Sequence, residues 1–134
     1  MKKTSLTQLL DIKYPIIMAP MFLVTNTKMM IEAINSGIAA CIPALNYRTD
    51  EQFREAIKEI RANTTSKGLG INLIVNKSNI KVQQQLKTCV ELGVDFIITS
   101  LGSPKEVIEQ CKPKGIKVFC DVVEEKYAKK VEEL

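Results

Sequence analysis

Five short apolar runs, rich in β-branched residues, recur along the chain with polar segments between them. They cover residues 16–19, 38–44, 70–75, 94–100 and 116–122. Each run is continuous rather than alternating, which is typical of parallel strands that are covered on both faces. Successive runs begin 22 to 32 residues apart. This spacing fits strand–helix units joined by short loops.

The segments between the runs predict helices over residues 28–36, 49–62, 79–93 and 103–111. In the second of these segments, Phe53, Ile57 and Ile60 fall at helical spacing and define one buried face. The third segment ends at Gly93, a residue type that commonly terminates helices.

Two of these helices begin with a possible capping box. Thr49 with Gln52 fits this motif, and so does Ser103 with Glu106. Pro104 would then occupy the first helical position, where proline is favoured. These signals indicate where each helix begins.

Consecutive strand–helix units are compatible with a doubly wound open sheet or with part of a (β/α)8 barrel. No G-x-G-x-x-G or G-x-x-x-x-G-K-[ST] motif follows any run, which weakens the nucleotide-binding open-sheet alternative. A complete barrel usually takes about 250 residues. We therefore expect an α/β fold in which residues 1–134 are the N-terminal five βα units of a truncated TIM-type barrel. Its uncovered sheet edges would favour a homo-oligomer.

Charge and hydropathy exclude several classes of partner. The net charge of +4 arises from 19 basic and 15 acidic residues that are intermixed, and there is no tryptophan to stack on bases. A nucleic-acid partner is therefore not expected. No apolar run approaches the ~20 residues of a membrane helix. The first residues also lack the pattern of a secretory signal, so we expect a cytoplasmic location.

Histidine and paired cysteines, which often carry metal or acid–base chemistry, are absent from the sequence. Four cysteines are present without a C-x-x-C pair, and Cys41, Cys89 and Cys120 lie within apolar patterns. This predicts reduced, buried thiols rather than a disulfide or a metal site. The chain contains no histidine, so its own residues supply no imidazole.

Ligands of parallel α/β folds bind at the carboxyl ends of the strands, which directs attention to Ala19-Pro20-Met21. Pro20 ends the strand ladder and would leave the amides of Met21 and Phe22 free for an acceptor-rich ring. The Met21 side chain could lie against the face of that ring. The alternative is a core methionine after an ordinary strand-ending proline.

Asn72 lies in the middle of the third run, where an unpaired buried amide would cost about 1–3 kcal/mol. It either pairs with a neighbouring strand or points into the barrel mouth to bind a ligand. Thr99 and Ser100 end the fourth run, and a hydroxyl there either binds a ligand or simply starts a turn. Asp121 ends the fifth run, where a helix cap is favoured over a catalytic role.

At "YPIIMAPM", "IPALNYRT", "GINLIVNKSN" and "FIITSLGSPKEVIE" the sequence resembles the nitronate monooxygenase family, formerly called 2-nitropropane dioxygenases. These are flavin-dependent (β/α)8 enzymes related to enoyl-acyl-carrier-protein reductase II. The resemblance extends over essentially all of the chain and keeps the order of its elements. The combination of P-I-[IV]-x-A-P-M with G-[IV]-N-L is its most specific part.

The resemblance implies an FMN lying across the barrel mouth. Ala19, Pro20 and Met21 would contact the flavin ring through backbone groups, Asn72 would contact the flavin, and Thr99 and Ser100 would lie nearby. The substrate would be an alkyl nitronate, which is oxidised with oxygen to a carbonyl compound and nitrite. Flavin supplies the electron chemistry in such enzymes, and the protein orients the ring and the substrate.

The family's catalytic histidine and glycine-rich phosphate loops belong to later strands and would lie beyond Leu134. We therefore expect no catalytic residue and no metal ligand in this chain, weak FMN binding, and no turnover by the chain alone.

Three alternatives remain at this point. One is an enoyl-acyl-carrier-protein reductase II-like enzyme that draws on NAD(P)H and FMN. Another is a non-catalytic half-barrel that folds or dimerises without a ligand. The third is a doubly wound domain, which would place Met21 and Asn72 on different sides of the switch point.

Overall fold

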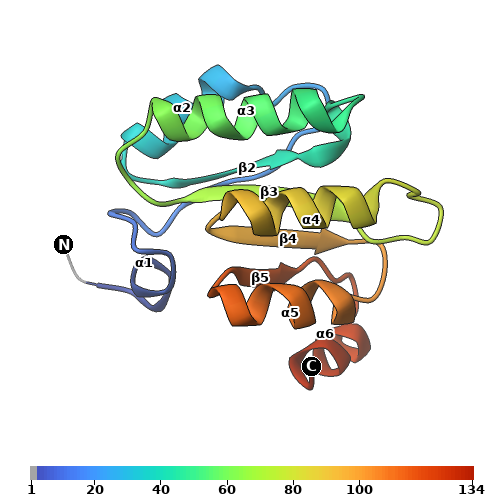
Figure 1. The fold of residues 1–134 in the computed structure, drawn as a ribbon. Helices are drawn as coiled ribbons and strands as arrows, with labels where there is room; N and C mark the ends of the chain where they lie inside the picture. Colours follow the sequence, from blue (N-terminus) through green and yellow to red (C-terminus); the bar gives the residue numbers. More distant parts are fainter. Residues whose placement is uncertain (1–2) are drawn as a thin grey trace.

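The computed structural model describes residues 3–134 as one parallel five-stranded sheet flanked by helices (Figure 1). The strands are β1 (Ile17–Met18), β2 (Ala39–Pro43), β3 (Leu69–Ile74), β4 (Phe96–Ser100) and β5 (Lys117–Cys120). The helices are α1 (Ser5–Leu10), α2 (Thr27–Asn35), α3 (Asp50–Ala62), α4 (Val82–Leu92), α5 (Lys105–Cys111) and α6 (Glu125–Glu132). Short 3-10 turns cover Ala44–Asn46 (η1) and Lys112–Lys114 (η2).

The strand order is sequential, β1-β2-β3-β4-β5, and every neighbouring pair is parallel. The helices α2 to α5 succeed one another along the same side of the sheet (Figure 1). A doubly wound sheet would reverse its strand order and carry helices on both faces. The structure is therefore a half-barrel of the TIM type, and the doubly wound alternative is wrong.

The helix-facing side of the sheet forms the larger core. Its strand residues include Ala40, Ile42, Leu69, Ile71 and Ile97, all at most 1% exposed. The predicted stripe of α3 packs here, with Phe53, Ile57 and Ile60 at most 2% exposed. In β2 and β3 the residues of both parities are covered, which explains why these two apolar runs are continuous.

The opposite, inner face carries a smaller core built on Ala39, Cys41 and Phe96. The helix α1, which the sequence pattern did not indicate, lies at the amino-terminal ends of the strands and contributes Leu10 to this core. Thr4 caps α1 with a complete capping box that uses Thr7. The barrel interior is thus closed at the amino-terminal ends of the strands, whereas it stays open at their carboxyl ends.

The two predicted capping boxes turn out differently from expectation. The Thr49 hydroxyl accepts from the Gln52 amide at 3.2 Å, but the Gln52 side chain accepts from the Arg48 amide instead of completing the box. The box predicted for Ser103 and Glu106 is wrong, because α5 begins at Lys105 after an N-cap without a side-chain hydrogen bond.

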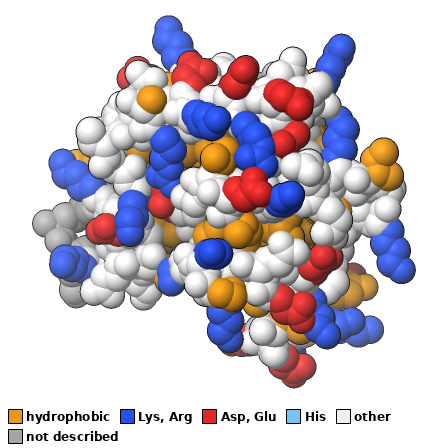
Figure 2. Space-filling view, in the orientation of Figure 1, with side chains coloured by type: hydrophobic (Ala, Val, Ile, Leu, Met, Phe, Trp, Pro, Cys, Tyr) orange, Lys and Arg blue, Asp and Glu red, His pale blue; other side chains and the backbone are white. Residues whose placement is uncertain are grey.

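All of the cysteines are free thiols. Cys41, Cys89 and Cys111 are buried, while Cys120 is only half-buried, so Cys111 and not Cys120 completes the buried set. Within residues 3–134, no group of three or more potential ligands could hold a metal ion. None of the helices described is sufficiently long and apolar to pass through a membrane. Figure 2 shows basic and acidic side chains intermixed over the face that carries α3 and α4.

Candidate functional site at the open end of the half-barrel

Strand alternation assigns each residue at the carboxyl ends of the strands to one of the two faces. Phe96 belongs to the inner core, so Ile98 and Ser100 share its face. In the neighbouring ladder, Asn72 pairs with Ile98, which places its side chain on the inner face as well. Asp121 follows Phe119, another inner-core residue, with the same parity. Three polar side chains therefore converge at the open end of the half-barrel.

Hydrogen bonds join these three side chains, and we call Asn72, Ser100 and Asp121 the mouth cluster. The Asn72 amide nitrogen Nδ2 donates to the Ile98 carbonyl and to Ser100 Oγ, both at 3.0 Å. Ser100 Oγ in turn donates to Asp121 Oδ2 at 3.3 Å. Asn72 is only 8% exposed, and both N–H donors of its amide are satisfied within the protein.

The other half of the Asn72 amide remains available. Its carbonyl oxygen Oδ1 accepts no hydrogen bond from any residue of the described chain, although the amide as a whole is nearly buried. The two alternatives for Asn72 are therefore not exclusive: Nδ2 pairs with a neighbouring strand, and Oδ1 is left as an acceptor. Because the Nδ2 bonds fix the amide plane, Oδ1 has a defined orientation and keeps its capacity to accept a hydrogen bond.

Asp121 is a site residue for which the sequence pattern predicts a helix cap. The structure contradicts that assignment, since the N-cap of α6 is Glu124 and no side chain caps this helix. The Asp121 carboxylate instead accepts from Ser100, and the Asp121 amide donates to the Thr99 carbonyl at 2.9 Å, extending the ladder by one residue. The alternation from Phe119 to Asp121 was the signal that could have identified it.

The Ala19-Pro20-Met21 corner lies on the same side as the mouth cluster. Ile17 packs in the inner core and Met18 against the helix-side core, so alternation turns Ala19 to the inner face that holds Asn72. Ala19 is exposed, and Met21 is 38% exposed and therefore not a core methionine. The short Ala19 side chain leaves the backbone of this corner accessible to a ligand.

One feature expected of this corner is wrong. The Met21 amide is not free, because it donates to Thr25 Oγ1 at 3.0 Å. The loop is held further by Asn46, whose Oδ1 accepts from the Leu23 amide and whose Nδ2 donates to the Thr25 carbonyl, each at 2.9 Å. Leu23 adopts a positive φ of 59° within this loop. Of the two amides singled out, only that of Phe22 has no acceptor in the described chain.

Thr99 lies apart from the mouth cluster. It has the parity of Ile97, a residue of the helix-side core, and it is 2% exposed. Its hydroxyl donates to the Phe119 carbonyl at 3.4 Å. The side chain of Thr99 therefore faces the helices, and its neighbour Ser100 is the residue that reaches the open end.

An apolar surface lies next to the mouth cluster, on its amino-terminal side along the strands. Ile98 and Phe119 are half-buried members of the inner core, and the rings of Phe96 and Phe119 meet edge to face with centroids 5.6 Å apart. This arrangement combines an apolar surface with a rim of one amide, one hydroxyl and one carboxylate. Such a combination is typical of sites that bind small molecules.

Solved structures that are similar to this chain include two of FabK from Thermotoga maritima. FabK from Thermotoga maritima superposes with a TM-score of 0.89 and 26% sequence identity, over 99% of this chain and 42% of that one. A point mutant of the same FabK gives a TM-score of 0.87 and 27% identity, over 99% of this chain and 44% of the mutant. No protein-family model matches the sequence, and no curated protein does. The chain thus spans less than half the length of the FabK structures that it matches.

Proposed function

We propose that this chain forms the flavin-ring side of an FMN-dependent oxidoreductase built on a (β/α)8 barrel. The observation that carries the proposal is the convergence of Ala19, Asn72 and Ser100 on the inner face at the open end of the strands. The similarity to FabK, an enoyl-acyl-carrier-protein reductase II, over nearly the whole chain supports it.

The residues present fit the ring of a flavin. Asn72 offers an oriented acceptor, Oδ1, to a ring N–H, and the Phe22 amide offers a donor to a ring carbonyl. Ile98 and Phe119 give the ring an apolar surface to lie against. FMN, when bound, would supply the redox chemistry, while these residues would hold its ring.

Asp121 has a positioning role in this proposal. Its carboxylate fixes the Ser100 hydroxyl, and Ser100 in turn accepts from Asn72, so the orientation of the amide depends on both. The acidic group also lies beside the proposed ring site. A negative charge beside a flavin would disfavour the anionic reduced form and so lower the reduction potential of the flavin.

For the substrate, we propose reduction of an enoyl thioester with NAD(P)H, because the similar solved structures are of FabK. Oxidation of an alkyl nitronate is the second candidate, favoured by the "YPIIMAPM" and "GINLIV" segments alone. A complete barrel that contains this chain distinguishes the two. Anaerobic oxidation of NAD(P)H that depends on a crotonoyl thioester supports the reductase, whereas oxygen uptake with propionate 3-nitronate and release of nitrite supports the oxygenase.

The cofactor proposal is tested on the chain itself by titrating FMN and following its fluorescence. We expect saturable quenching with the unmodified chain and a loss of binding in Asn72→Leu, which removes the acceptor but keeps the volume. Asn35→Ala is a matched control, because Asn35 lies at the end of α2 and donates only to the Asn63 carbonyl. Equal FMN affinities for all three proteins would refute the assignment of Asn72.

We further propose that the protein acts on a small molecule in the cytoplasm, and that the open edges at β1 and β5 are covered by further strands or by a second copy of the chain. Sedimentation velocity of the 134-residue chain tests the second-copy version, which requires a dimer at micromolar concentration.

A further inference from the structure

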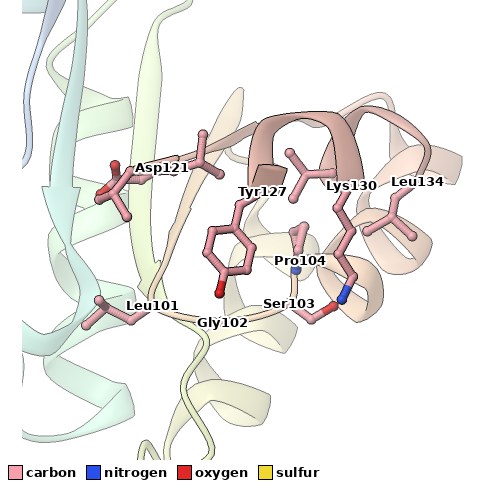
Figure 3. A pocket seen from close by; sticks show the side chains of 11 residues that line it. Leu101, Gly102, Ser103, Pro104, Asp121, Tyr127, Lys130 and Leu134 are labelled. Carbon is pink, nitrogen blue, oxygen red and sulfur yellow. The ribbon is translucent and has the colours of Figure 1, made fainter. Parts of the chain in front are cut away.

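A separate cavity of about 400 Å³ lies between the loop that follows β4 and the helix α6 (Figure 3). Its walls are mainly aliphatic and include Leu101, Val122, Val123 and Leu134. Of the mouth cluster, only Asp121 borders this cavity. Its volume is in the range of sites that bind small molecules.

One wall of the cavity is a loop that packs closely against the sheet. Leu101 has a positive φ of 62°, which a side-chain-bearing residue rarely adopts. Gly102 packs against the end of β3 so closely that a β-carbon there would lie 2.6 Å from the Val75 carbonyl oxygen. The loop is therefore seated on the sheet and gives the cavity one fixed wall.

Charged groups make the two ends of the cavity electrostatically different. In Figure 3, Lys130 extends from α6 beside Ser103, while Asp121 lies towards the sheet. Lys129 is paired with Glu125 at 2.7 Å, but Lys130 has no carboxylate within 4.0 Å among residues 3–134. The Tyr127 hydroxyl points towards the loop at Gly102, between the two charged residues. An anionic group is thus attracted at the Lys130 end and repelled at the Asp121 end.

We infer that this cavity binds an amphiphilic anion, a carboxylate with an aliphatic body of medium length. The aliphatic body lies along Leu101, Val122 and Val123, and the carboxylate meets the Lys130 ammonium. The tail points towards Asp121, because the reverse orientation would bring two carboxylates together. The site requires no flavin, so it stands independently of the function proposed above.

The test is a heteronuclear NMR titration of the 134-residue chain with octanoate, 1-octanol and octylammonium, without FMN. These probes share one chain and differ in the charge of the head group. Octanoate is expected to bind most tightly and octylammonium least, with amide shifts at Gly102, Ser103 and Tyr127. Lys130→Gln is expected to weaken octanoate binding roughly two- to fivefold, the range for an exposed charge pair.

Matched variants distinguish binding at this site from non-specific binding of the probes. Lys129→Gln removes a neighbouring lysine that is already paired and is expected to leave octanoate affinity unchanged. Val123→Asp places a carboxylate on the wall at a residue that is 90% exposed and is expected to weaken octanoate binding. Ile80→Asp makes the same change at a residue that is 92% exposed and does not line the cavity. Equal affinity for the three probes, equal effects of the paired variants, or shifts confined to other elements would overturn the inference.

Discussion

The ring of Phe96 occupies the space that a side chain at Gly70 would need. A β-carbon on Gly70 would lie 2.1 Å from Cζ of Phe96, and these residues are direct partners in the β3–β4 ladder. Phe96 is fully buried in the inner core below the mouth cluster. Gly70, at the start of "GINLIV", therefore lets the ring of Phe96 fill the interior of the half-barrel on the amino-terminal side of the mouth cluster.

Gly70→Ala is expected to destabilise the chain by about 1–3 kcal/mol, the usual cost of overpacking a core. The clash is with a ring braced edge to face against Phe119, so it is not relieved by a flexible side-chain end. Urea unfolding followed by circular dichroism measures this loss. The double variant Gly70→Ala with Phe96→Leu should recover part of the stability, and a Gly70→Ala chain as stable as the parent would contradict the packing described.

Asp50 joins α3 to α4 through a buried hydroxyl. Thr88, which is fully buried on α4, donates to one carboxylate oxygen, while Arg54 and Gln84 donate to the other. Burial by itself raises the pKa of Asp50, but these hydrogen bonds outweigh it and the net pKa lies below its ordinary value. Stability from a carboxyl of depressed pKa is complete above the ordinary pKa and is lost as the pH falls through the folded-state pKa.

Thr88→Val is expected to cost about 2 kcal/mol near neutral pH, because it removes a hydrogen bond to a charged group. The difference in unfolding free energy between the parent chain and Asp50→Asn should shrink as the pH is lowered into the range where Asp50 is protonated. Glu125→Gln serves as the control, since the exposed Glu125–Lys129 pair contributes little. If the difference in unfolding free energy between the parent chain and Asp50→Asn grew on acidification, the depressed pKa of Asp50 would be contradicted.

The thiols should differ sharply in their reactivity. Burial raises the pKa of Cys41 and of Cys89 well above the ordinary range, and it raises the pKa of Cys111 to about 11. Because the thiolate is the nucleophile, these three are expected to react with iodoacetamide only on unfolding. Mass spectrometry of the native chain should show at most one rapid modification, at the half-buried Cys120, and none in Cys120→Ser. Rapid modification of Cys89 would contradict the described packing of α4.

The sheet was predictable because its signal is local and strong. The middle strands β2 and β3 are covered on both faces, which produces continuous apolar runs, and the spacing of the runs leaves room for one helix between neighbours. The helix α1 was missed because it is short, with Leu10 as its only fully buried apolar residue. Its position depends on the inner core, which the chain pattern alone does not describe.

The site was predictable only in part. Asn72 stood out because a primary amide is unusual within an apolar strand, and the structure places it in the mouth cluster. Thr99 and Ser100 were grouped together, yet alternation sends their side chains to opposite faces. The capture of the Met21 amide by Thr25 and the bond from Ser100 to Asp121 depend on how loops fold over strand ends. Neither contact leaves a sequence signal of its own.

The central claim is that the inner face at the open end of the strands holds a flavin ring. The most direct measurement is a map of backbone amide shifts when FMN is added to the isotopically labelled chain. The account predicts perturbations at Ala19, Phe22, Asn72, Ser100 and Asp121, all lost together in Asn72→Leu. Shifts confined to the outer surfaces of α3 and α4, or no shift at millimolar FMN, would contradict it.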